Sequence, residues 1–83
     1  MASREPFAIE VGPPNWAPLE RWLTPSECAF FMYMGRAGQI ELYKHRLNRR
    51  YLNIGQDSKS FYRYSDGVYV EITRAAALDH VRG

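Results

Sequence analysis

Cysteine and histidine are scarce in this chain. Cys28 is the single cysteine among 83 residues, and His45 and His80 are the two histidines. One cysteine cannot form an intramolecular disulfide, so we expect a reducing, cytoplasmic setting rather than a secreted, disulfide-stapled scaffold. The three residues do not share the spacing of metal ligands, and Cys28 follows the pattern of a small buried apolar residue. The sequence therefore predicts no metal site and no reactive thiol.

Long apolar runs and catalytic loops are also lacking. Nowhere do about 18 apolar residues follow one another, which predicts no membrane-spanning helix and no signal peptide. The sequence has no Gly-rich phosphate loop, no nucleophile elbow and no His-Glu-x-x-His motif. We therefore expect no cofactor and a protein that is not an enzyme.

Acidic residues are missing from one segment, where the positive charge gathers. The chain has 11 Lys and Arg against 9 Asp and Glu, and four of those cations lie in 44–50, which leaves 7 cations against 9 anions elsewhere. The segment also contains His45 and no acidic residue. Because binding to nucleic acid depends on concentrated charge rather than on the total, this segment indicates nucleic acid or an acidic protein surface as a partner.

The length and composition are typical of one small folded domain. Hydrophobic residues make up 46% and aromatic residues 14% of the chain, too many for a disordered segment. We expect a single domain over 1–83, with residues 1–14 as an extended lead-in that contains a short strand at Phe7–Val11. So short a chain buries only a thin core, which makes a homodimer a candidate.

Helices are predicted in the N-terminal half. Trp and Leu recur at helical spacing over 15–23, which favours a short helix. Thr24-Pro25-Ser26-Glu27 has the pattern of a capping box and begins a second helix, which we expect to end before Gly35. Residues 29–34 are all apolar, so a buried strand is the alternative there. Residues 35–38 are interpreted as a linker.

Residues 39–54 fit either a helix that ends at Gly55 or a hairpin with its turn at Leu47-Asn48. We favour the hairpin because it leaves fewer large apolar residues outside the predicted core. In this interpretation Ile40, Leu42, Leu52 and Ile54 share one face of the sheet, and Tyr43 and Tyr51 share the other.

The C-terminal third predicts a second hairpin and a closing helix. Strands at 61–64 and 68–72 flank the turn signal Ser65-Asp66-Gly67, and Thr73 is placed to cap a helix over 74–81. The expected fold class is α+β, with short N-terminal helices, about four antiparallel strands in a meander, and a C-terminal helix packed on one sheet face. The sheet face expected to pack on the helices consists of Ile40, Leu42, Leu52, Ile54, Val68, Val70 and Ile72, together with Trp16, Trp22 and Phe31.

The opposite sheet face is the predicted functional site, because it combines aromatic rings with cations. Bases of single-stranded nucleic acid stack on such rings while cations contact phosphates. The predicted nucleic-acid-binding residues are Tyr43, Lys44, His45, Arg46, Arg49, Arg50, Tyr51, Arg63 and Tyr69. A purely structural interpretation remains open, since tyrosines are also good strand residues beside long charged side chains.

The predicted function is a small non-catalytic binding module for single-stranded nucleic acid or a phosphate backbone. The alternative is a protein-interaction or homodimerising regulatory domain without nucleic acid, with Trp16, Trp22 and Phe30 as its contact residues. Aromatic residues in excess of what a thin core buries favour that alternative.

The segment Asn48-Arg49-Arg50-Tyr51-Leu52-Asn53 resembles the Asn-Arg-Arg-Leu-Tyr-Asp/Asn stretch near the start of polyhydroxyalkanoate synthesis repressors, a DNA-binding family. The likeness covers residues 44–53. Leu and the aromatic residue are exchanged relative to that family, and the helical region before the segment has no counterpart there. The resemblance implies DNA binding for this segment, and no family is recognised from it.

Overall fold

The computed structural model of the chain describes residues 9–83. The elements in chain order are β1 (Ile9–Glu10), α1 (Ala17–Trp22), α2 (Pro25–Cys28), β2 (Phe31–Ala37), β3 (Ile40–His45), β4 (Tyr51–Gly55), β5 (Phe61–Ser65), β6 (Val68–Ile72) and α3 (Arg74–Arg82). Of the strand predicted at Phe7–Val11, Phe7 and Ala8 lie outside the described residues, and Ile9 and Glu10 form β1.

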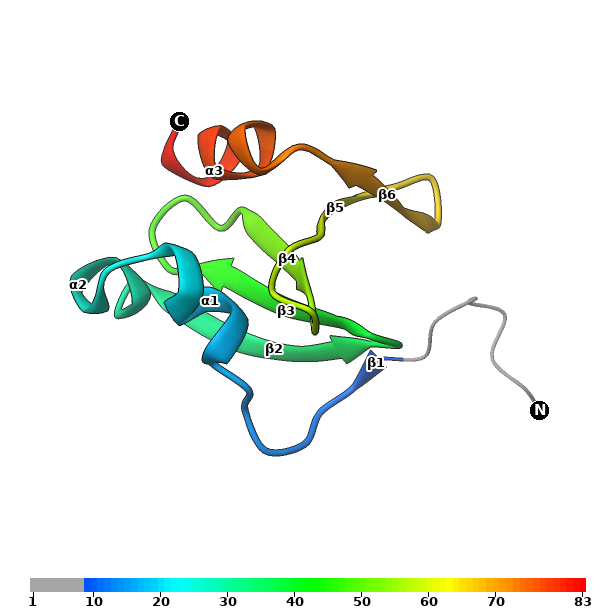
Figure 1. The fold of residues 1–83 in the computed structure, drawn as a ribbon, viewed down its shortest axis with the longest axis horizontal. Helices are drawn as coiled ribbons and strands as arrows, with labels where there is room; N and C mark the ends of the chain where they lie inside the picture. Colours follow the sequence, from blue (N-terminus) through cyan, green and yellow to red (C-terminus); the bar gives the residue numbers. More distant parts are fainter. Residues whose placement is uncertain (1–8) are drawn as a thin grey trace.

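The strands form one antiparallel sheet in the order β1-β2-β3-β4-β5-β6, so each strand pairs with its neighbour in the sequence. Figure 1 shows this meander. The β5–β6 hairpin follows β4, and α3 then runs back to pack against β4 and β5. The predicted α+β class, with an antiparallel sheet and a C-terminal helix packed on it, is confirmed. The sheet has six strands rather than about four, because β1 and β2 add to the two predicted hairpins.

The predicted helix from Pro25 to Gly35 is wrong beyond its first turn. The capping box forms, with the Glu27 N–H donating to Thr24 Oγ1 at 3.2 Å and the Thr24 N–H to Glu27 Oε1 at 3.0 Å. The helix ends at Cys28, and β2 begins at Phe31. Because this segment is apolar throughout, it has no amphipathic pattern that favours a helix, and hydrogen-bonded pairing with β3 decides its structure. The predicted linker 35–38 is also wrong in part, since Gly35, Arg36 and Ala37 belong to β2.

The hairpin predicted within 39–54 is present as β3 and β4, so the helical alternative is wrong. The faces assigned to its residues are also wrong. Tyr43 pairs with Leu52, and Leu42 pairs with Asn53. A turn centred between residues 47 and 48 pairs odd-numbered with even-numbered positions, and residues directly opposite share a face. Leu42 and Leu52 therefore lie on opposite faces of the sheet.

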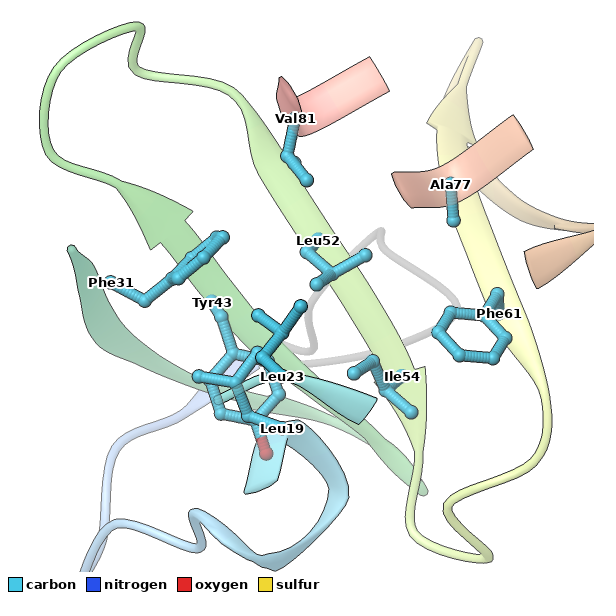
Figure 2. Close-up of a cluster of buried hydrophobic side chains, with 9 residues drawn as sticks. All are labelled: Leu19, Leu23, Phe31, Tyr43, Leu52, Ile54, Phe61, Ala77 and Val81. Carbon is cyan, nitrogen blue, oxygen red and sulfur yellow. The ribbon is translucent and has the colours of Figure 1, made fainter. Parts of the chain in front are cut away.

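The main core lies between the helices and one face of the sheet (Figure 2). Its buried members are Leu19, Leu23, Phe31, Tyr43, Leu52, Ile54, Phe61, Ala77 and Val81. Ile40 and Leu42, predicted for this core, belong instead to a smaller cluster with Ala37. Val68 and Val70 were predicted to be buried but are 46% and 38% exposed. Within β6, Ile72 is the residue that packs against the main core.

The closing helix α3 is fixed at both ends. Thr73 caps it, because its Oγ1 accepts the Ala76 N–H at 3.1 Å. At the other end, side chains of the β3–β4 turn donate to the last carbonyls: Asn48 Nδ2 to Val81 O at 2.7 Å and an Arg50 guanidinium nitrogen to His80 O at 2.9 Å. The turn of one hairpin therefore holds the C-terminal helix.

Within residues 9–83, every helix is too short or too polar to cross a lipid bilayer.

Candidate functional site

The candidate site is a groove that opens where β4 and β5 separate. These strands pair at two positions only, Asn53 with Tyr62 and Ile54 with Phe61. Beyond them β5 continues in register with β6, while the first residues of β4 pair with β3. The space between has a volume of about 1020 Å³ and is also bounded by α3, through Ala76, Ala77 and His80. We call it the β4–β5 groove.

Four tyrosines line the groove: Tyr51, Tyr62, Tyr64 and Tyr69. Tyr64 is 58% exposed and Tyr51 38%, while Tyr62 and Tyr69 are half-buried. Tyr64 and Tyr69 contact each other edge to face, with ring centroids 5.1 Å apart. The Lys44 ammonium stands 5.7 Å from the centroid of the Tyr51 ring. The groove therefore offers aromatic faces to a ligand at its mouth.

Three arginines line the same groove: Arg49, Arg50 and Arg63. No acidic residue is among the described residues that line it. Arg49 and Arg63 are exposed, and their guanidinium groups form no ion pair with residues 9–83, whereas Arg50 is bonded to α3. Glu71 lies opposite Tyr62 in the β5–β6 register, just outside the lining. The groove is therefore basic, with two arginines available to an anion.

Asn53 is the polar residue at the floor of the groove, where Leu42 and Met34 are its apolar neighbours in the lining. Asn53 is 3% exposed. Its Nδ2 donates to Tyr62 O at 3.3 Å, which fixes the direction of the amide. Its Oδ1 is buried and accepts no hydrogen bond from residues 9–83. A buried acceptor without a donor is uncommon in folded proteins.

The groove brings together five of the predicted nucleic-acid-binding residues: Arg49, Arg50, Tyr51, Arg63 and Tyr69. Lys44 lies beside Tyr51, outside the lining. Arg46 is exposed in the β3–β4 turn and its backbone N–H donates to Phe30 O, so it too lies outside the groove.

Tyr43 and His45 lie on the helix side of the sheet, not on the face to which they were predicted to belong. Tyr43 is wholly buried in the core, where burial raises the pKa of its phenol and its hydroxyl donates to Asn15 O. The His45 ring stacks on Phe30 at 5.8 Å, and its Nδ1 accepts the Leu47 N–H at 3.1 Å. Both residues therefore stabilise the fold on the helix side of the sheet rather than the open face.

The three residues of the alternative contact surface differ in how far they are exposed. Trp16 is half-buried and stacks on Tyr43, with centroids 5.8 Å apart. Trp22 is also half-buried, and its Nε1 donates to Ser58 O at 2.7 Å. Phe30 is 45% exposed. The tryptophans pack against the main core, so Phe30 is the most exposed of the three.

The predicted binding residues do not include four residues that line the groove: Tyr62, Tyr64, Asn53 and His80. For the tyrosines a signal existed, because positions 62 and 64 share one face of a strand. For Asn53 the signal was a polar side chain between Leu52 and Ile54 in an otherwise apolar strand. His80 carried no sequence signal, since its place depends on how α3 packs.

The most buried carboxylate, Glu41, is part of a structural cluster away from the groove. It is wholly buried and accepts hydrogen bonds from the Tyr33 hydroxyl, Arg36 Nε at 3.1 Å and Gln56 Nε2 at 2.8 Å. Burial raises the pKa of Glu41, but these hydrogen bonds outweigh it and leave that pKa below its ordinary value. Burial and the bond to Glu41 raise the pKa of Tyr33 to about 12. A saturated carboxylate of this kind holds strands together.

Neither the thiol of Cys28 nor a cluster of metal ligands forms a second candidate site within residues 9–83. Cys28 is half-buried and its pKa is raised by burial, which lowers its reactivity. Among residues 9–83 no group of three or more His, Cys, Asp or Glu side chains is arranged to hold a metal ion.

No protein-family model matches the chain, and no curated protein or solved structure is significantly similar to it. The resemblance of residues 44–53 to polyhydroxyalkanoate synthesis repressors is thus not accompanied by a family match. The fold and the groove carry the functional argument.

Proposed function

We propose that this chain is a non-catalytic binding module and that its β4–β5 groove binds single-stranded nucleic acid. The observation that carries the proposal is the lining of the groove, which combines four tyrosines and three arginines with no acidic residue among the described lining residues. Aromatic faces for bases and guanidinium groups for phosphates are the two elements that sequence-tolerant single-strand binders combine.

The arrangement assigns different parts of the ligand to different residues. Tyr51 and Tyr64, the most exposed of the four rings, stack on bases, with about 1–3 kcal/mol for each stacked base. Arg49 lines the groove from the β3–β4 turn and Arg63 from β5, so phosphates contact both edges. A duplex hides its base faces, which is why the tyrosines favour an unpaired strand.

Binding of short fluorescent single-stranded oligonucleotides, measured by anisotropy, tests the proposal. The double substitution Arg49→Gln with Arg63→Gln removes the two lining arginines that form no ion pair with residues 9–83 and should weaken binding by about tenfold or more, because each contact with a phosphate is charge-assisted. Arg21→Gln with Lys59→Gln removes the same charge outside the groove and should leave the affinity nearly unchanged.

Two results would count against this function. Equal affinity of the Arg49/Arg63 variant and the wild type would show that the groove does not hold the oligonucleotide. If the protein bound polyglutamate but none of the oligonucleotides, its partner would be an acidic protein surface rather than nucleic acid.

A homodimer is a second candidate, favoured by the exposure of Val68 and Val70 on the terminal strand β6. Exposed apolar residues on an edge strand are a common site of association. Light scattering over a dilution series tests it, with Val70→Lys expected to abolish any dimer. A mass that stays that of the monomer at every concentration would exclude this candidate.

A further inference from the structure

We infer that Asn53 reads the base at the floor of the β4–β5 groove, where its Oδ1 accepts a hydrogen bond from an exocyclic amine, so that the groove prefers the bases that carry such an amine, adenine, cytosine and guanine, to uracil or thymine. This inference rests on the proposed function and specifies which ligand the groove takes.

The side-chain amide of Asn53 is oriented before a ligand arrives. Its Nδ2 donates to Tyr62 O at 3.3 Å, at the last position where β4 and β5 pair. Rotating the amide by half a turn would bring two carbonyl oxygens together, so the orientation with Oδ1 away from Tyr62 O is the stable one. Oδ1 is therefore a fixed acceptor.

This acceptor has no donor in the described part of the chain. Oδ1 is buried without a hydrogen-bond partner among residues 9–83, and Asn53 is 3% exposed. Leaving a buried carbonyl unpaired destabilises a protein, and such an atom in a binding groove is explained when a ligand supplies the donor. Because Oδ1 accepts only, phosphate and carboxylate groups do not satisfy it. The arginines at the rim of the groove therefore bind an anionic group, whereas Asn53 Oδ1 at its floor binds a neutral hydrogen-bond donor.

The depth of Asn53 Oδ1 in the groove restricts the shape of the donor. Oδ1 lies beneath the surface, so a base reaches it once side chains of the groove move aside, and the donor has to project from the edge of the base. The amines of adenine and cytosine project one bond beyond the ring. The N3–H of uracil lies within the ring between two carbonyls, which would approach Oδ1 with like partial charge. An exocyclic amine thus fits best.

A ligand series tests this inference without altering the protein. Oligoadenylate is compared with an oligomer of purine riboside, which keeps the ring system and the phosphates but lacks the amine, and with oligouridylate. Wild-type protein should bind both amine-free strands about tenfold more weakly than oligoadenylate, as expected for one lost hydrogen bond to a buried acceptor. Equal affinity for oligoadenylate and the purine strand would overturn the role of Asn53.

A protein variant gives the matching control. Asn53→Leu replaces the amide by an apolar group of similar size and should bind the three strands equally, with the salt dependence of the wild type, because the arginines remain. Thermal unfolding shows whether the variant is folded, and the ligand series on wild type stands without it. A retained preference of folded Asn53→Leu for oligoadenylate would overturn the inference. Failure of every strand to bind wild type would instead overturn the proposed function, and the inference with it.

Discussion

Glu41 illustrates how one residue ties together distant parts of the chain. Its carboxylate on β3 is bonded by Tyr33 and Arg36 of β2 and by Gln56 after β4. Arg36 in turn donates to Pro13 O and so holds the segment that leads into α1. A single charged side chain therefore connects the N-terminal segment with three neighbouring parts of the sheet.

We predict that Glu41→Gln lowers the unfolding free energy at neutral pH by about 1–3 kcal/mol, because charge-assisted hydrogen bonds are lost and buried donors remain. The effect depends on pH. The folded pKa of Glu41 lies below the ordinary value of 4.5, so its stabilisation is present above about pH 4.5 and disappears as the pH falls through the folded pKa. Urea unfolding of wild type and variant at neutral and acidic pH measures both effects.

The difference in unfolding free energy between wild type and Glu41→Gln should become smaller on acidification, because protonation neutralises the wild-type carboxylate as well. Glu71→Gln is the matched control, because Glu71 is exposed, and its effect should stay within about 0.5 kcal/mol. A gap that keeps its full size at acidic pH would contradict the role assigned to the Glu41 charge.

At the scale of elements, Gly35 allows β1 to join the sheet. Gly35 has φ +101° beside the irregularity in the β2–β3 register between Tyr33 and Arg36. A Cβ at this position would lie 2.5 Å from the Glu10 carbonyl oxygen of β1. Both the backbone conformation and the close approach of β1 therefore require glycine.

We predict that Gly35→Ala is more destabilising than Gly67→Ala. Gly67 also has a positive φ, +85°, but a Cβ there meets no atom within 4 Å. Gly67→Ala should therefore lower the unfolding free energy by about 1–2 kcal/mol from backbone strain alone, whereas Gly35→Ala adds a clash with β1. Chemical denaturation measures both, and hydrogen exchange at Ile9 and Glu10 should rise only in Gly35→Ala. Equal losses would show that β1 is not in close contact.

The sequence predicted elements wherever a local signal defines them, and the capping box at Thr24 and the cap at Thr73 both form. It did not predict β2, because an all-apolar segment satisfies helix and strand alike. The faces of β3 and β4 were assigned wrongly although the turn was placed correctly, since that turn already implies that Tyr43 is opposite Leu52. The groove depends on where β4 and β5 stop pairing, which is set by packing and has no local signature.

At the scale of the whole molecule, the net charge of +2 is small, so attraction of an anionic strand depends on the local cluster in the groove. We predict that log K falls with log salt concentration with a slope of about −1.4, from the two contacts of Arg49 and Arg63 with phosphates of a single strand. The Arg49→Gln with Arg63→Gln variant should reduce the slope to near zero, and Arg21→Gln with Lys59→Gln should preserve it. Titrations at several salt concentrations measure the slope, and an unchanged slope in the first variant would remove these arginines from the interface.

The order of strands also bears on how the chain folds. From β2 onward, each strand pairs with the one before it across a turn of a few residues, whereas α1 and α2 lie between β1 and β2 in the chain. The sheet is therefore able to form stepwise by short loop closures, which keeps contact order low for a β-rich chain and favours fast folding. The long closures are those that pair β1 with β2 and bring α1 and α3 onto the sheet, so we expect these contacts to form late. The β5–β6 hairpin is joined to β4 by two residue pairs, so we expect it to be the first part of the sheet to open.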